Sequence, residues 1–298
     1  MTKNLESIAE AATLRVGGID YLNALPLTDY LPLTEDPPLV VTNLAPSALA
    51  RGLRSGELDL ALVPVVEYLA VESYKIIPDI CISSYGAVES IRFYHRKPLS
   101  EVRRVGIDSS SRTSAMLTRV LFRLRWNSSP EFFDLSPRAI EAFLDEQSEE
   151  GRTDSGDKVE VPHDLDAVLL IGDSALWRQA PLGWRQVDLG NEWTRWTGLP
   201  FVYAFWVWRG DRPVPAGLID RFQRGKEIGV TRIDEIVRRW CDAHGGNETL
   251  ARDYLRRVIQ YDFGEVQRKG LLEFFGLLNK VGVLSEAPQQ LRSVESFS

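Results

Sequence analysis

The chain has 298 residues, of which 44% are hydrophobic and 26% are charged, a composition typical of a globular protein with one large or two ordinary domains. Its formal net charge of −7 argues against a nucleic-acid partner held by a basic surface, although the local field of a pocket can still favour an anion. Its two cysteines, Cys81 and Cys241, lie far apart and predict neither a metal site nor a disulfide framework.

The N-terminal residues do not resemble a targeting segment. Asn4, Glu6 and Glu10 interrupt the apolar run that a secretory signal needs, and no stretch of the chain approaches the length of a membrane span. We therefore expect a cytoplasmic protein without a membrane partner.

The first predicted elements alternate between strands and helices. A strand over 14–19 leads into the loop YLNALPL, a second strand covers 39–44, and a helix begins at Pro46 and ends before Gly56. Alternating apolar residues then predict a strand over 58–62 that Pro64 ends. The later segment DLDAVLLIGDSALW repeats this strand–turn–helix pattern, which indicates two α/β lobes built on one plan.

The remaining segments complete this organisation. Two strand-like runs lie within 80–96, and 102–126 predicts a strand, a polar loop and an amphipathic helix. The polar stretch 146–162 predicts a mobile surface insertion, and 201–208 predicts a buried strand. Helical patterns then cover 216–228, 231–243, 248–259 and 265–281.

Together these elements favour an α/β, two-lobed, periplasmic-binding-protein-like fold of type II with a helical C-terminal segment. In such a fold the chain crosses twice between lobes, here near 91–97 and 198–206. We expect residues 1–95 to begin lobe 1, residues 96–199 to form lobe 2, and residues 200–298 to return to lobe 1. This step is fold analogy and by itself implies no function.

The strongest local signal for a site is IDSSSRTSAML, where a strand gives way to a helix. A helix N-terminus offers unpaired N–H groups and partial positive charge, which suit a carboxylate or phosphate, and Arg112 could add a charged contact. A single serine there would be explained by helix capping, but the clustering of hydroxyl groups favours anion binding. The hydroxyl residues are Ser109, Ser110, Ser111, Thr113 and Ser114.

Other candidates are weaker on spacing alone. Asn23 follows the first strand, where α/β sheets place ligands, but the spacing favours an asparagine that satisfies the loop backbone. Gly172 permits close backbone approach, and Asp173 is better explained as a helix cap than as a catalytic group. Nothing in the spacing marks Ser90 as a nucleophile, and the histidines have no triad or metal spacing.

Aromatic residues gather in the segment 193–208. They predict mainly residues of the hydrophobic core, with one or two that form part of the wall of a pocket for a ring-shaped ligand. They are Trp193, Trp196, Phe201, Tyr203, Phe205, Trp206 and Trp208.

Several segments, taken in order, resemble one known family. They are GGIDYLNALPL, SGELDLALVP, ISSYGAVESI, GIDSSSRTSAMLTRVL, LLIGDSAL, LGNEWTRWTGLPFVYAFW and YLRRVIQYDFGEVQRKGLLEFF. As a set they resemble the chorismate dehydratases of futalosine-dependent menaquinone biosynthesis over residues 14–283, and only the insertion at 146–162 departs from the family pattern.

The resemblance implies a hydro-lyase that removes water from chorismate to give 3-[(1-carboxyvinyl)oxy]benzoate, with no metal or organic cofactor. It implies catalytic roles for Asn23 and Ser90. The substrate, a small dicarboxylate, would be bound by Ser111, Arg112, Thr113, Ser114, Gly172 and Asp173, and one of its own carboxylates could remove the proton.

Three alternatives remain open. 1,4-Dihydroxy-6-naphthoate synthase shares the fold, but its first loop typically carries a Ser-Pro-Cys-Pro-Asn-Asp-like motif, where this chain has YLNALPL. A non-catalytic solute-binding protein for a small carboxylate also shares the fold, and the expected lack of a secretory signal argues against it. A ligand-sensing domain of a transcription regulator would usually carry a helix-turn-helix and a basic patch, and neither is evident.

Overall fold

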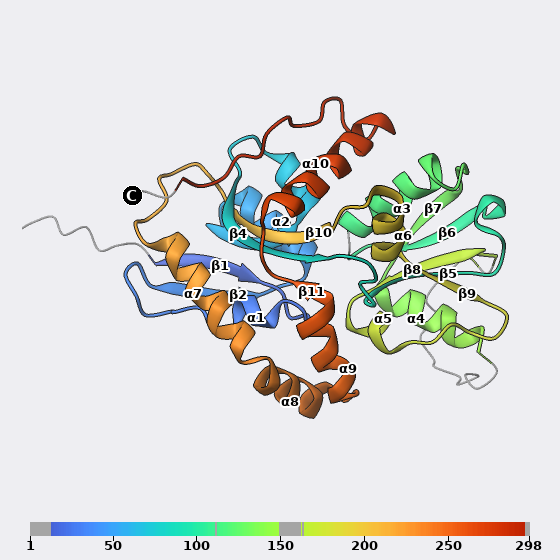
Figure 1. Cartoon of the computed structure of the whole chain (residues 1–298), viewed down its shortest axis with the longest axis horizontal. Helices are drawn as coiled ribbons and strands as arrows, with labels where there is room; N and C mark the ends of the chain where they lie inside the picture. The colour runs from blue at the N-terminus through green and yellow to red at the C-terminus, as the bar shows by residue number, and fades with distance from the viewer. Residues whose placement is uncertain (1–12, 111, 149–161, 163, 296–298) are drawn as a thin grey trace, which may run out of the picture.

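The structure, a computed structural model, describes residues 13–110, 112–148, 162 and 164–295. Two α/β lobes lie side by side, each with its own sheet (Figure 1). Ser111 and residues 149–161 of the predicted insertion lie outside the described residues.

The sheet of the first lobe has the strand order β11-β4-β10-β3-β1-β2. β1 pairs in parallel with β2 and β3, whereas β10 runs antiparallel between β3 and β4. Every residue of β10 is buried, as expected of a central strand covered on both faces. The strands are β1 (Leu14–Gly18), β2 (Leu39–Asn43), β3 (Leu60–Pro64), β4 (Lys75–Ser84), β10 (Phe201–Trp208) and β11 (Ile259–Gln260).

The sheet of the second lobe has the order β7-β6-β8-β5-β9. β6 pairs in parallel with β7 and β8, and β5 runs antiparallel between β8 and β9. The strands are β5 (Ile91–His95), β6 (Arg104–Asp108), β7 (Glu131–Leu135), β8 (Ala167–Ile171) and β9 (Arg185–Asp188).

The two sheets therefore share one plan. In the first sheet β1 lies between its parallel neighbours β2 and β3, and β10, which enters from the other lobe, lies antiparallel beyond β3. In the second sheet β6 lies between its parallel neighbours β7 and β8, and β5, which enters from the first lobe, lies antiparallel beyond β8. The chain crosses between Ser84 and Ile91 and returns between Thr197 and Phe201. The first crossing thus precedes the expected boundary at residue 95, because β5 pairs in the second sheet.

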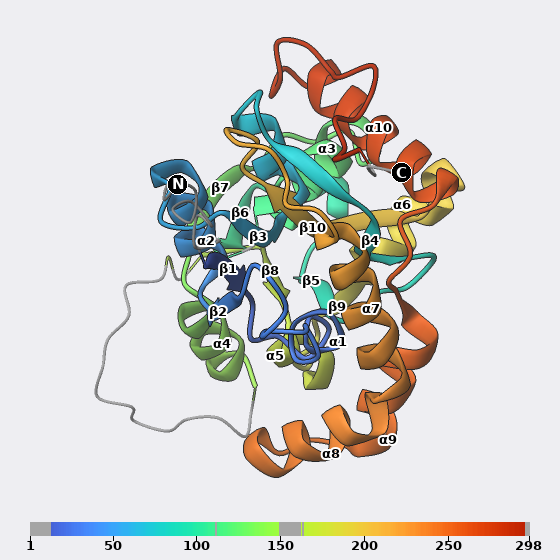
Figure 2. The ribbon, with the colours of Figure 1, turned by 90° about the vertical axis from the view of Figure 1, so that its left-hand side faces the viewer.

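Helices cover both sheets, and those of the C-terminal segment pack mainly on the first lobe (Figures 1 and 2). α7 packs on α1 and β4, whereas α10 contacts both β10 and, across the lobes, α3. The α-helices are α1 (Leu25–Thr28), α2 (Pro46–Ser55), α3 (Arg112–Leu124), α4 (Pro137–Glu146), α5 (Asp173–Trp177), α6 (Leu189–Thr197), α7 (Leu218–Thr231), α8 (Ile233–His244), α9 (Glu248–Asp253) and α10 (Glu265–Lys280). Short 3₁₀ helices are η1 (Val65–Ala70) and η2 (Leu99–Glu101), and a π-helical turn, η3, covers Tyr254–Val258.

Local sequence explains the bounds of α2 and the buried face of α3. Pro46 opens α2, and Gly56, whose φ of 79° suits a residue without a side chain, ends it. α3 buries Leu117, Val120 and Leu121 on one face, which confirms the predicted helical spacing.

The aromatic segment is mostly core, as predicted. Trp193, Phe201 and Phe274 pack edge to face where α6 meets β10, and they are at most 1% exposed. This cluster packs the second crossing between α6, β10 and α10.

Candidate active site

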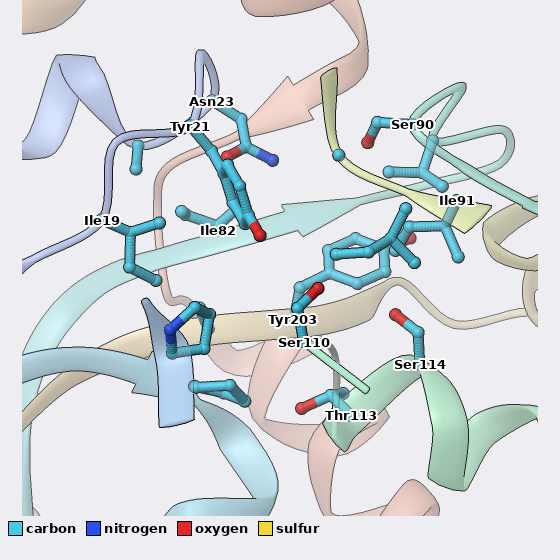
Figure 3. Close-up of a pocket in the computed structure, with 17 residues that line it drawn as sticks. Ile19, Tyr21, Asn23, Ile82, Ser90, Ile91, Ser110, Thr113, Ser114 and Tyr203 are labelled. Atoms are coloured by element: carbon cyan, nitrogen blue, oxygen red, sulfur yellow. The ribbon is translucent and has the colours of Figure 1, made fainter. Parts of the chain in front are cut away.

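A cavity lies between the lobes, with walls from both. It encloses ≈ 610 Å³, counted with the solvent at its mouth. Figure 3 shows Asn23 and Ser90 on one side of this space and Ser110, Thr113 and Ser114 on the other. The lining residues are Ile19, Tyr21, Asn23, Ala24, Pro46, Pro64, Ile82, Val88, Ser90, Ile91, Ser110, Thr113, Ser114, Ile171, Gly172, Tyr203 and Ala204.

The lining is apolar with a few polar groups. Among the described residues that form it, none is an aspartate, glutamate, lysine, arginine or histidine. Isoleucine, proline, tyrosine, alanine and valine side chains make most of the wall and suit a ring-shaped ligand, while hydroxyl and amide groups can fix its orientation. Any carboxylate bound here would be held by neutral donors.

The N-terminus of α3 supplies the hydroxyl side of the cavity. Thr113 and Ser114 are 2% and 1% exposed, and both line the cavity. The Oγ1 atom of Thr113 finds no hydrogen-bond partner within the described part of the chain. A buried hydroxyl of this kind costs free energy unless something else satisfies it, so it points to a polar ligand.

Asp108 shapes the loop that precedes this helix. Its Oδ1 accepts hydrogen bonds from the backbone N–H of Ser110 at 2.9 Å and from the Ser110 hydroxyl at 2.5 Å. Burial raises the pKa of the Asp108 carboxyl above its usual range. Ser110 in turn lies beside the hydroxyl of Tyr21, which enters the cavity from the first lobe (Figure 3).

Arg112 does not line the cavity. Its Nη1 lies 2.6 Å from Oε2 of Glu67, a buried carboxylate on η1 of the first lobe that also pairs with Arg54. The expected contact of Arg112 with substrate is therefore replaced, in this structure, by an ion pair that joins the lobes.

Ser90 sits in the first crossing segment, which is held in an unusual conformation. Asp188 accepts hydrogen bonds from the backbone N–H groups of Val88 and Glu89, while it also caps α6. Glu89 has a φ of 63°, an uncommon value for a residue with a side chain. The Gly172 N–H then donates to the Ser90 carbonyl at 2.8 Å, so Ser90 is fixed from both sides.

Asn23 lies in the loop before α1 and faces Ser90 across one tyrosine. Its Nδ2 donates to the Tyr254 hydroxyl at 2.9 Å, and that hydroxyl donates to Ser90 Oγ at 2.8 Å. The hydroxyl of Tyr261 donates to the Asn23 backbone carbonyl at 3.1 Å. The loop thus has its backbone satisfied by another residue, and the Asn23 side chain lines the cavity.

Gly172 lines the cavity, but Asp173 is not the helix cap that the sequence predicts. Gly172 occupies the N-cap position of α5, with no side-chain cap bond. The Asp173 carboxylate instead accepts a hydrogen bond from the backbone N–H of Leu22 in the other lobe, at 3.2 Å. Burial raises the pKa of Asp173 to about 6. The capping prediction was wrong because a partner distant in sequence reaches the same carboxylate.

The sequence did not single out several residues of the site. Tyr21, beside Asn23, and the apolar wall of Ile19, Ile82 and Ile171 carry no spacing that separates them from core. Tyr203 belongs to the aromatic segment and lines the cavity, and its contact with a ring-shaped ligand stays a prediction.

The described residues contain neither a candidate metal centre nor a candidate membrane span. No group of three His, Cys, Asp or Glu side chains there could hold a metal ion. No helix in that part of the chain is long and apolar enough to cross a membrane.

Fold and cavity place this chain in the class of two-lobed α/β proteins with a periplasmic-binding-protein-like fold. Solved structures agree: a protein of Archaeoglobus fulgidus has a TM-score of 0.69, with 14% identity, and the match covers 93% of this chain and 100% of that one. The periplasmic aliphatic sulphonate binding protein of Escherichia coli gives 0.59, with 14% identity over 96% and 94% of the two chains. A Candida albicans protein described as having the generic periplasmic binding protein fold gives 0.62, with 13% identity over 96% and 99%.

Sequence comparison identifies the family to which the chain belongs within this fold class. The family described as menaquinone biosynthesis matches residues 14–151 and 151–280, and the chain belongs to this family. A chorismate dehydratase of Thermus thermophilus is 29% identical over 271 residues, which cover 85% of this chain and 91% of that protein.

Proposed function

We propose that this protein is a chorismate dehydratase that converts chorismate to 3-[(1-carboxyvinyl)oxy]benzoate for menaquinone biosynthesis. Membership of the menaquinone family and similarity to the Thermus enzyme support this function. The observation that carries it is the uncharged cavity, in which Asn23 and Ser90 face the hydroxyl groups of α3. A biosynthetic role of this kind belongs in the cytoplasm.

The reaction is an elimination that ends in an aromatic ring. The C3–H bond breaks, its electron pair forms the C3–C4 double bond, and the C4–O bond breaks, so that one water is lost. Aromatisation supplies much of the driving force, and the protein mainly has to position the substrate. An apolar wall suits that task, because it accepts the ring and excludes water.

In this proposal Thr113, Ser114 and the N-terminal N–H groups of α3 hold one substrate carboxylate. The Thr113 hydroxyl, buried and without a partner among the described residues, would gain one on binding. Ser111 belongs to the same proposed set, although it lies outside the described residues. Gly172 lets the ligand approach the backbone, and Asp173 contributes by holding Leu22 from across the cleft.

Asn23 and Ser90 act on the reacting end. A neutral amide and a hydroxyl can hydrogen-bond a carboxylate without neutralising it, so the second carboxylate of the substrate stays available as the base that removes the C3 proton. The same groups can steady negative charge as the proton leaves. No described side chain of the lining is a strong base, which agrees with catalysis assisted by the substrate.

The test is direct. Purified protein is incubated with chorismate, and the aromatic product is followed by ultraviolet absorbance and identified by mass, with Asn23→Asp as the matched inactive variant. Formation of the aromatic ether only with the parent protein supports the proposal. Chorismate that binds and is recovered unchanged would instead indicate a solute-binding protein. Release of 1,4-dihydroxy-6-naphthoate from its own precursor would indicate the other pathway enzyme.

A further inference from the structure

The hydroxyl of Tyr254 joins the two residues to which catalysis is assigned. It accepts from Asn23 Nδ2 at 2.9 Å and donates to Ser90 Oγ at 2.8 Å. Tyr254 is 0% exposed and is not among the residues that line the cavity. The tyrosine therefore contacts the Asn23 and Ser90 side chains but does not itself contact a ligand in the cavity.

The backbone that carries Tyr254 is irregular at this residue. α9 ends at Asp253, and a π-helical turn begins at Tyr254. Single π turns inside or at the end of helices occur frequently at functional sites. Directly after this turn, β11 pairs with Ser83 and Ser84 of β4, which anchors the segment to the first sheet next to the crossing that carries Ser90.

The hydrogen-bond directions decide what the tyrosine does. A phenol has one proton, and here that proton is given to Ser90, so the Ser90 proton must point elsewhere. The Ser90 side chain lines the cavity, so its own donor is available to a ligand there. The Asn23 side chain is held by the hydrogen bond that its amide nitrogen donates to Tyr254. This bond determines how the amide nitrogen and the amide oxygen are turned toward the same ligand. Burial raises the pKa of Tyr254 well above its usual value, so it keeps this proton.

We propose that Tyr254 is a positioning residue that fixes the donor and acceptor polarity of Asn23 and Ser90 through its single hydroxyl. This proposal rests on the proposed dehydratase function. Loss of the hydroxyl would leave Ser90 and Asn23 in place but free to turn, and catalytic groups that are misoriented lose turnover more than substrate affinity.

The experiment is steady-state kinetics of Tyr254→Phe with chorismate, beside Tyr94→Phe as the matched control. Tyr94 is equally buried, and its hydroxyl donates to a backbone carbonyl of Arg178 in the second lobe, at 3.2 Å. We expect Tyr254→Phe to lower kcat about 10- to 100-fold with KM changed by less than about threefold. Tyr94→Phe should keep kcat within about twofold.

A double-mutant cycle separates positioning from general damage. Because Tyr254 acts in part through Ser90, Tyr254→Phe should lower kcat by a clearly smaller factor in the Ser90→Ala background than in the parent. A kcat of Tyr254→Phe that stays near the parental value, or losses that multiply in the double variant, would overturn the proposal. A parent protein without turnover of chorismate would count against the proposed function instead.

If Tyr254→Phe does not fold, a second double-mutant cycle tests the role of the hydroxyl. The hydroxyl couples Asn23 to Ser90, so the combined loss in Asn23→Ala with Ser90→Ala should fall short of the product of the single losses by roughly tenfold or more. Incorporation of 4-aminophenylalanine at position 254, which keeps an N–H donor for Ser90, should keep kcat within about tenfold of the parental value. Multiplicative losses in the cycle, or a larger loss of kcat in the folded amino analogue, would refute the role of the hydroxyl.

Discussion

Thr113→Val is expected to weaken binding without weakening the fold. The Thr113 hydroxyl is 2% exposed, lines the cavity and has no hydrogen-bond partner among the described residues. Valine has nearly the same shape, so the change removes an unsatisfied polar atom and leaves the packing of α3 intact. The melting temperature should therefore stay the same or rise.

In Thr113→Val the affinity for a carboxylate ligand, in contrast, should fall. A hydrogen bond from a neutral donor to a charged group contributes about 1.5–3 kcal/mol, and its loss corresponds to a roughly 10- to 150-fold rise in Kd. We would measure this Kd by calorimetry with the product 3-[(1-carboxyvinyl)oxy]benzoate, so that turnover does not interfere. Folding would be checked by circular dichroism.

Thr118→Val is the matched control on the same helix. The Thr118 hydroxyl donates to the Ser114 backbone carbonyl at 2.8 Å, so its loss should cost about 0.5–1.5 kcal/mol of stability and change the Kd by less than about threefold. An unchanged Kd in folded Thr113→Val would refute the reasoning, because the hydroxyl cluster would then serve only the helix.

Four further outcomes are expected. Asn23→Asp should be nearly inactive in the aromatic-product assay, because it adds like charge beside the substrate, and Ser90→Ala should lower kcat about 10²–10³-fold with little change in affinity. Near-parental turnover in either folded variant would remove that residue from catalysis. Arg112→Gln should lower the free energy of unfolding by less than the roughly 3–5 kcal/mol that an unpaired buried carboxylate costs, because Glu67 keeps its ion pair with Arg54. A tenfold rise in the Kd for the product would contradict a purely structural role of Arg112. Asp173 has a pKa raised to about 6, so its contribution to stability is present below about pH 4 and is lost as the pH rises through 6. The melting temperature of Asp173→Asn relative to the parent should therefore rise across that window, and a constant difference would contradict it.

Much of the fold follows from local sequence patterns. The strand–turn–helix units at residues 60–70 and 167–177 both exist, and the sheets around them have corresponding strand orders apart from the additional strand β11. The first crossing was placed a few residues late because Ile91–His95 has the pattern of a strand, whichever sheet it joins. Periodicity identifies a strand but does not identify its partner.

Residue patterns indicated the part of the site that follows strands. Asn23, Thr113, Ser114 and Gly172 lie in segments that follow β1, β6 and β8, and the structure brings them to one cavity, whereas Ser90 precedes β5 and was indicated only by the family resemblance. Tyr254 lies on a helical segment where a buried tyrosine has the pattern of core, and only the tertiary fold places its hydroxyl against residues distant in sequence. The contacts of Arg112 with Glu67 and of Asp173 with Leu22 could not be predicted for the same reason, since both partners lie in the other lobe.

The insertion of β10 between β3 and β4 has a consequence for synthesis on the ribosome. Until residues 201–208 emerge, β3 and β4 lack the strand that separates them, and each presents open backbone groups. The second lobe, by contrast, takes all its strands from residues 91–188. The second lobe can therefore complete its sheet before the first lobe does. The strands of the first lobe that are made early need protection until the last third of the chain has been translated.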